Sequence, residues 1–153
     1  MLDKKFFRDI SSNVVMNYRK HIFDPAGGGS SARQVDGKPY PNYTQKYRQR
    51  KSTGNLKVYG KPQHKKFKGS KAPVLTGDLL RDYGFQKYMT NGFSFGFKSE
   101  GAKVKRLAEL NRVLSSKQVP IPKSVGKFIE KEAEKYVDKK LKKTKGGTFN
   151  IGR

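Results

Sequence analysis

The chain has 153 residues, the size of one domain, and its 35 Lys and Arg against 12 Asp and Glu leave a formal net charge of +23. Such a charge opposes a compact isolated monomer, so it predicts contact with a polyanion or with acidic protein surfaces, or folding within an assembly. There is no cysteine, and the two histidines, His21 and His64, are far apart. Disulfide scaffolds, thiol catalysis and structural zinc are therefore excluded, and we expect no metal and no cofactor.

The sequence also bears on the compartment. No run of apolar residues approaches the roughly 18 that a membrane-spanning helix needs. Residues 1–9 carry charges where a secretory signal would have its apolar stretch. We therefore expect no membrane partner and a protein made and kept in a cytoplasm-like compartment.

An amphipathic helix is predicted from Leu2 to Ile22. Apolar residues recur there every four positions, at Leu2, Phe6, Ile10, Val14 and Tyr18. The helix should end at Asp24-Pro25, because the residue before a proline is disfavoured in the helical conformation. The following Gly27-Gly28-Gly29-Ser30-Ser31 lacks the lysine of a phosphate-binding P-loop, so we interpret it as a flexible linker.

Residues 37–75, which we call the basic segment, contain eleven Lys or Arg and no Asp or Glu. A short helix is expected around 42–51, because Tyr43 and Tyr47 lie four apart on one helical face. Glycines and prolines punctuate the remainder, which we interpret as a long loop or extended arm. Loops of this length in a compact domain either have a function or are disordered.

A capped helical turn and a β-hairpin are expected next. The Thr76 hydroxyl is placed to cap the turn 76–82, with Asp78 near the positive end of the helix dipole and on one face with Asp82. Alternating aromatic residues then flank Asn91-Gly92, a strong hairpin signal. The sequence predicts an aromatic hairpin over 83–99 that packs against the N-terminal or C-terminal helix.

Two further helices are expected. Apolar spacing predicts one within 101–114, and a second should begin after Ser124 as its N-cap and continue to Lys143. Residues 144–153 are interpreted as a flexible tail. The predicted fold class is thus α+β: a small antiparallel sheet with the hairpin 83–99 against N-terminal and C-terminal helices, and a long basic arm at 37–75. Residues 1–143, with the loop 24–75, would form a single domain.

The basic segment has the composition that phosphate contacts and base stacking require. The predicted contacts to a nucleic acid or an acidic partner are Arg48, Arg50, Lys51, Lys57, Lys61, Lys65, Lys66, Lys68 and Lys71, with Tyr59 and Phe67 as stacking residues. Lysine outnumbers arginine in the chain, which favours sequence-independent phosphate contact over base readout. The alternative is a solvated loop that keeps the protein soluble.

Signals for catalysis are weak. Asp78 and Asp82 resemble a carboxylate pair, but a first-turn charge explains Asp78 better, and no histidine is placed nearby by the sequence. We therefore expect no catalytic residues and no enzyme activity. A small basic nuclease that relies on Lys, Arg and Tyr stays open as an alternative.

The order of elements resembles a known family. An N-terminal helix, the stretch Tyr40-Pro41-Asn42-Tyr43-Thr44-Gln45-Lys46-Tyr47, the turn Leu75-Thr76-Gly77-Asp78-Leu79, a hairpin and a closing helix are similar to the tail-completion or virion-morphogenesis (neck) proteins of tailed bacteriophages. The similarity in order covers about residues 1–143. The chain departs from that family in its longer, more basic segment 37–75 and in Gly101-Ala102-Lys103-Val104, which stands where the family has Tyr-Ala and His-x-x-Gly signals.

The resemblance implies an α+β virion subunit without catalysis, assembled in the host cytoplasm. Such subunits form a homo-oligomeric ring between portal and tail, and the ring surrounds the channel through which double-stranded DNA passes. Portal, connector or tail proteins would then be its partners. The alternative from composition is a free-standing nucleic-acid-binding protein, either ribosome-associated or a packaging factor.

Overall fold

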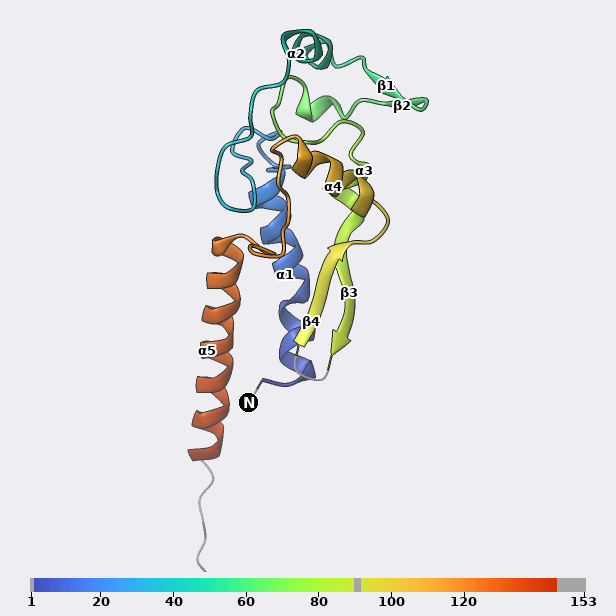
Figure 1. The fold of residues 1–153 in the computed structure, drawn as a ribbon. Coiled ribbons are helices and arrows are strands. Elements are labelled where there is room, and N and C mark those ends of the chain that lie inside the picture. Colours follow the sequence, from blue (N-terminus) through green and yellow to red (C-terminus); the bar gives the residue numbers. More distant parts are fainter. Residues whose placement is uncertain (1, 90–91, 146–153) are drawn as a thin grey trace, which may run out of the picture.

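The computed structural model describes residues 2–89 and 92–145 and is a mixed helix and sheet fold (Figure 1). Within those ranges the helices are α1 (Lys4–Ile22), α2 (Gln45–Ser52), the 3-10 turn η1 (Lys65–Phe67), α3 (Asp78–Asp82), α4 (Gly101–Glu109) and α5 (Lys123–Lys145). The strands are β1 (Lys57–Val58), β2 (Lys61–Pro62), β3 (Tyr83–Met89) and β4 (Gly92–Phe97), in two antiparallel pairs. The predicted α+β class is confirmed.

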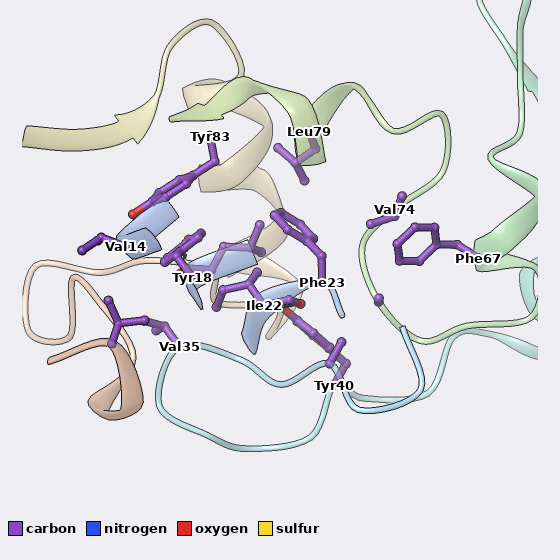
Figure 2. Close-up of a cluster of buried hydrophobic side chains, with 14 of the residues drawn as sticks. Val14, Tyr18, Ile22, Phe23, Val35, Tyr40, Phe67, Val74, Leu79 and Tyr83 are labelled. Atoms are coloured by element: carbon purple, nitrogen blue, oxygen red, sulfur yellow. Dashed lines mark hydrogen bonds between the residues drawn. The ribbon is translucent and has the colours of Figure 1, made fainter. Parts of the chain in front are cut away.

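Helix α1 is the centre of the core. The Asp3 carboxylate accepts the Phe6 amide and caps the helix start, as short polar side chains do at this position. Of the apolar positions expected from the four-residue spacing, Phe6, Ile10, Val14 and Tyr18 are buried, as Figure 2 shows for Val14 and Tyr18. Leu2, the predicted first residue, lies before the helix, which begins at Lys4, and is only partly buried. The prediction of an amphipathic helix is confirmed, and the buried face is the one read from the sequence.

The aromatic hairpin packs on one side of α1. Strands β3 and β4 pair with Tyr83 opposite Phe97 and Phe85 opposite Phe95, so these four rings share one face of the sheet. Tyr83 stacks on Tyr18 of α1 with ring centroids 3.6 Å apart. The register shifts between Phe85 and Lys87, where the strand contains an irregularity. The hairpin is confirmed, and its Asn91 turn lies outside the described residues.

Helix α5 lies along another side of α1 (Figure 1). The Tyr136 hydroxyl donates to the Asp3 carboxylate, and its ring centroid lies 5.2 Å from that of Phe6. The helix starts at Lys123 rather than after Ser124, whose hydroxyl contacts the His21 ring instead. It also includes residues 144 and 145, which the sequence assigned to a flexible tail; residues 146–153 lie outside the described residues.

The glycine-rich loop 24–31 is an ordered turn, so its interpretation as a flexible linker is wrong. The Asp24 carboxylate accepts hydrogen bonds from the Gly27 and Ser31 amides and from the Ser30 hydroxyl. A Cβ on Gly29, whose φ is +85°, would lie 2.1 Å from the Ser70 hydroxyl oxygen. Glycine is therefore required here because the loop packs directly against the basic segment.

The predicted helix 101–114 ends early. Helix α4 stops at Glu109, and Asn111 adopts a positive φ of 56° that turns the chain back toward α1. Arg112 and Leu114, which follow this turn, are both buried. Leu114 is fully buried, and its carbonyl accepts a hydrogen bond from the Tyr18 hydroxyl, while Arg112 lies under the basic segment.

Candidate nucleic-acid interface

The short helix expected around 42–51 is present as α2, Gln45–Ser52. The remainder of the basic segment, expected as a long loop or extended arm, is irregular for most of its length but contains the short β1/β2 hairpin and η1. These elements lie with α2 at one end of the molecule (Figure 1). Side chains of the segment enter the core: Tyr40 donates its hydroxyl to the Ile22 carbonyl at 3.0 Å, and Phe67 and Val74 are buried. Figure 2 shows Phe67 and Val74 packed together. The segment is thus held in place by its own apolar residues.

Lys51 of α2 is buried, with an exposed fraction of 1%. Its ammonium group donates to the carbonyls of Ser70 and Ala72 at 2.7 and 2.8 Å. Burial and, to a smaller extent, the neighbouring charge of Arg112 together lower the pKa of Lys51 to about 8. Lys51 therefore ties α2 to residues 70–72 and is not available as the surface contact predicted from the sequence.

Arg112 is a second buried cation beneath the same segment. Its guanidinium donates to the carbonyls of Lys71 and Pro41 at 3.0 and 2.8 Å. It also lies 3.7 Å from the centre of the Tyr43 ring, and the Lys51 ammonium lies 4.9 Å from the same centre. Two cations thus share one aromatic ring and four backbone carbonyls, an arrangement in which hydrogen bonds and cation–π contacts offset the cost of burying charge.

The remaining predicted contact cations are on the surface. Eight of the nine are exposed: Arg48, Arg50, Lys57, Lys61, Lys65, Lys66, Lys68 and Lys71. Phe67 has no exposed surface and packs beside His64 at 5.1 Å between ring centroids, so its predicted role in stacking on a base is wrong. Its position in η1 directs Lys65, Lys66 and Lys68 to solvent by burying the one apolar residue among them.

Tyr59, the other predicted stacking residue, is exposed, whereas Phe67 is buried. It occupies the β1/β2 turn with a φ of +48°, is followed by Gly60 at +77°, and its side chain is fully exposed. Positive φ at both turn residues is the geometry of a tight two-residue hairpin. The hairpin therefore presents an aromatic ring at its tip, flanked by the exposed Lys57 and Lys61.

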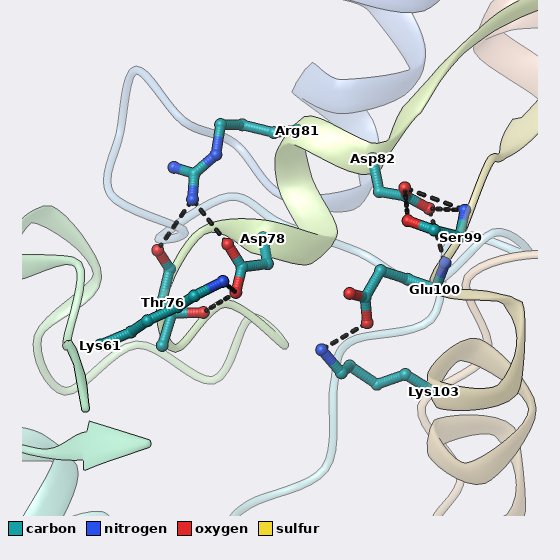
Figure 3. Close-up of polar contacts among 8 residues, drawn as sticks. All are labelled: Lys61, Thr76, Asp78, Arg81, Asp82, Ser99, Glu100 and Lys103. Atoms are coloured by element: carbon teal, nitrogen blue, oxygen red, sulfur yellow. Dashed lines mark hydrogen bonds and ion pairs between the residues drawn. The ribbon is translucent and has the colours of Figure 1, made fainter. Parts of the chain in front are cut away.

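Asp78 braces this hairpin (Figure 3). Its carboxylate binds Lys61 at 3.0 Å and Arg81 at 2.8 Å and accepts the Thr76 hydroxyl. The hydrogen bond from Lys61, followed by those from Thr76 and Arg81, lowers the pKa of Asp78. Thr76 makes no cap, since the N-cap of α3 is Gly77 without a side-chain hydrogen bond. This part of the prediction is wrong.

Asp78 and Asp82 form no carboxylate pair. Asp82 accepts the Ser99 amide and hydroxyl and the Glu100 amide, so it joins the end of α3 to the start of α4, away from Asp78 (Figure 3). Each carboxylate is engaged by structural donors. In the ranges 2–89 and 92–145 no group of three His, Asp or Glu residues is placed to hold a metal ion. No helix in those ranges is long and apolar enough to cross a membrane.

Comparisons of the chain with protein-family models, with curated proteins and with solved structures give no match. The resemblance to phage neck proteins therefore stays a prediction from sequence.

The residues missed by sequence reasoning are those that order the basic segment. Arg112 and Gln63 carried no signal, because their partners are distant backbone carbonyls: Gln63 donates to the Lys51 carbonyl at 2.9 Å. Tyr43 and Tyr47 did carry one. Their four-residue spacing indicated contact, and their ring centroids lie 4.7 Å apart although α2 begins only at Gln45.

Proposed function

We propose that the protein is a structural subunit of the head-tail connection of a tailed bacteriophage, in a neck or tail-completion ring, and that it has no catalytic role. In this proposal the exposed cations of the basic segment contact channel DNA or an acidic neighbouring virion protein. The support from sequence is the order of elements around Leu75-Thr76-Gly77-Asp78-Leu79. The site of action would be the virion, after assembly in the host cytoplasm.

One observation supports the polyanion contact above the others. Residues 37–75 contain no acid, and ten of their eleven cations are exposed, whereas residues 76–100 contain as many acidic as basic residues. A cationic surface on a folded body costs self-repulsion, which an anionic partner relieves. Because the segment is anchored by Lys51 and Arg112, this surface is fixed before any partner binds.

A second candidate function is a free-standing nucleic-acid-binding protein, and Tyr59 favours it. A fully exposed aromatic ring between two lysines matches the combination of base stacking and phosphate contact used on single strands. The two functions differ in stoichiometry, since a ring subunit assembles into a closed oligomer and a binding module works as a monomer.

The test combines native mass spectrometry with DNA binding measured across salt concentration. A closed oligomer whose DNA affinity falls steeply with salt supports the ring proposal, and a monomer with the same salt dependence supports the binding module. In the variant K65E/K66E/K68E we expect at least tenfold weaker DNA binding with unchanged thermal stability. The control K131E/K139E/K142E makes the same charge change on exposed positions of α5 and should have a much smaller effect. Equal loss in both variants would contradict a localised interface.

A further inference from the structure

A pocket of about 590 Å³ lies between the basic segment and helix α4. Its buried lining residues, which form its floor, are Pro73, Val74, Gly77, Leu79 and Arg112. One wall comes from Tyr47 of α2 and Val58 of β1, and another comes from Leu107 of α4. The elements that form the pocket lie at the end of the molecule away from the last turns of α5 (Figure 1).

Helix α4 has an apolar face that stays partly exposed. In the described fold no residue of α4 is buried, although the helix contains Val104, Leu107 and Ala108. Lys103, Leu107 and Leu110 are four and three residues apart, so they share one helical face, and this face lines the pocket. Leu110, directly after the helix, has an exposed fraction of 61%. An exposed apolar surface that continues into an apolar pocket is typical of a binding site for a partner.

Cations flank the pocket on two of its walls. Among the described residues that line it none is Asp or Glu, whereas Lys103 is part of its α4 wall. Lys61 lies beside the wall formed by Val58, because these two residues are paired across the β1/β2 hairpin. The Lys61 ammonium binds the Asp78 carboxylate at 3.0 Å. The Lys103 ammonium binds that of Glu100 at 2.5 Å (Figure 3). Because an ammonium group has three donors and both side chains are about half exposed or more, each can bind a further carboxylate.

The aromatic rings of the pocket are already engaged by other groups. The centre of the Tyr43 ring lies 3.7 Å from the Arg112 guanidinium and 4.7 Å from the centre of the Tyr47 ring, which is tilted by 57°. Stacking of a nucleic-acid base uses a free, flat aromatic face. Val58 and Leu107 add aliphatic walls, which contact an apolar side chain of any shape. The pocket therefore suits an apolar side chain better than a base.

We propose that this pocket binds an acidic segment of a partner protein, with one large apolar side chain of the partner in the pocket and its carboxylates on Lys61 and Lys103. The walls are fixed before the partner binds, because Lys51 anchors α2 and Arg112 anchors residues 41 and 71 beside the floor. A preformed pocket loses less conformational entropy on binding than one that must first be ordered.

This inference deepens the proposed function. It rests on that function for the presence of an acidic neighbouring protein, and it assigns the pocket and its flanking lysines to that neighbour instead of to DNA. Its binding energy has two parts, the burial of an apolar side chain, which salt leaves unchanged, and ion pairs at the surface, which salt weakens.

The test uses two fluorescent peptides and the full-length protein, with binding measured by fluorescence anisotropy. One peptide has a central tryptophan between two pairs of acidic residues, and the other has alanine at the centre. The tryptophan peptide should bind more tightly by a factor of about ten or more, because only its ring fills the pocket. Equal affinity of the two peptides would overturn the proposal, since charge alone would then drive the binding. So would a tryptophan peptide that does not bind at millimolar concentration.

Two pairs of variants locate the binding. Leu110→Asp should weaken binding of the tryptophan peptide by a factor of about ten or more with unchanged thermal stability. Leu141→Asp makes the same change at a leucine of α5 that is 54% exposed, and should leave the affinity within about twofold. Lys103→Gln should weaken binding about threefold and reduce its salt dependence, whereas Lys105→Gln, on another face of α4, should not. Equal losses in Leu110→Asp and Leu141→Asp would overturn the proposal.

A single-stranded oligonucleotide of thymidine serves as the competing occupant. If it displaces the tryptophan peptide and its own affinity falls in Leu110→Asp, the pocket binds nucleic acid and the proposal is overturned. The oligomeric state tests the ring proposal separately. A closed oligomer that does not bind the tryptophan peptide would overturn the present inference and leave the ring proposal standing. A monomer that binds the peptide through Leu110 would support this inference and contradict the ring.

Discussion

The aromatic hairpin and the basic segment are joined in one fold, but their stability has different origins. The hairpin is held to α1 by rings, as in the stack of Tyr83 on Tyr18 and the contact of Phe93 with Phe7 at 5.2 Å. The basic segment has a lower proportion of apolar residues, and two buried cations tie its parts together through backbone carbonyls. Asp78 braces the β1/β2 hairpin through Lys61, but α2 and residues 70–72 are held by Lys51 and Arg112, whose partners are backbone carbonyls and not acidic side chains.

This difference predicts different consequences of mutation. Loss of a ring in the hairpin contact removes packing that the whole molecule shares, so it should unfold the protein as a unit. Loss of a buried cation removes contacts that only the basic segment makes, so it should open that segment locally while α1 stays folded.

Tyr18→Ala should have the largest effect. The Tyr18 ring is fully buried between α1 and the hairpin, and its hydroxyl is bonded to the Leu114 carbonyl at 2.7 Å. The cavity and the unpaired carbonyl should reduce the free energy of unfolding by about 3–5 kcal/mol, measured by denaturant titration. Met16→Ala, at an exposed position of the same helix, should change it by less than about 0.5 kcal/mol. A loss under about 1 kcal/mol for Tyr18→Ala would place the core elsewhere.

Arg112→Met should have a smaller and more local effect. It leaves the carbonyls of Lys71 and Pro41 without their donor and removes the contact with Tyr43, at a cost of about 2–3 kcal/mol. Hydrogen exchange should show faster exchange of amides in residues 41–75, with amides of α1 unchanged. Arg106→Met, at an exposed position of α4, serves as the control. A uniform loss of protection would mean that the two regions unfold together.

The two regions also differ in how far the sequence predicted them. Helix α1, the hairpin and α5 follow from periodicity, because burial against one neighbour imposes a spacing of four or of two on the apolar residues. The β1/β2 hairpin and η1 have no such pattern. Their positions depend on Asp78 holding Lys61 and on Phe67 being buried, contacts that composition does not encode.

The sequence predicted which residues supply the positive charge of the candidate interface, but it did not predict how they are arranged in space. Eight of nine cations are on the surface as expected, since lysine and arginine are exposed by default. Lys51 and Phe67 were both predicted to be exposed contacts, but both side chains are buried. A lysine that finds two carbonyls can be buried, and an aromatic residue among lysines can be the anchor of the surface rather than part of it.

Lys51 allows the smallest and most specific test, through pH. Its pKa is about 8 in the fold, below the value of about 10.4 expected in the unfolded chain, so between these values the unfolded chain binds a proton that the folded chain does not. The contribution of Lys51 to the free energy of unfolding should therefore rise with pH across this window. At neutral pH the fold bears the energetic cost of burying the charged Lys51 ammonium, and this cost disappears when the amine loses its proton.

The measurement compares the free energy of unfolding of the wild type and Lys51→Met at pH 7.5 and 9.5. The wild type should gain about 1–2 kcal/mol relative to the variant over this range. Tyr43, the other titrating group at the site, has its pKa raised to about 12 by burial and stays protonated in the fold below pH 10. Lys68→Met, at an exposed position, should run parallel to the wild type. Parallel curves for Lys51→Met as well would show that the Lys51 amine reaches solvent, and the anchoring of α2 would then rest on Arg112 and Gln63 alone.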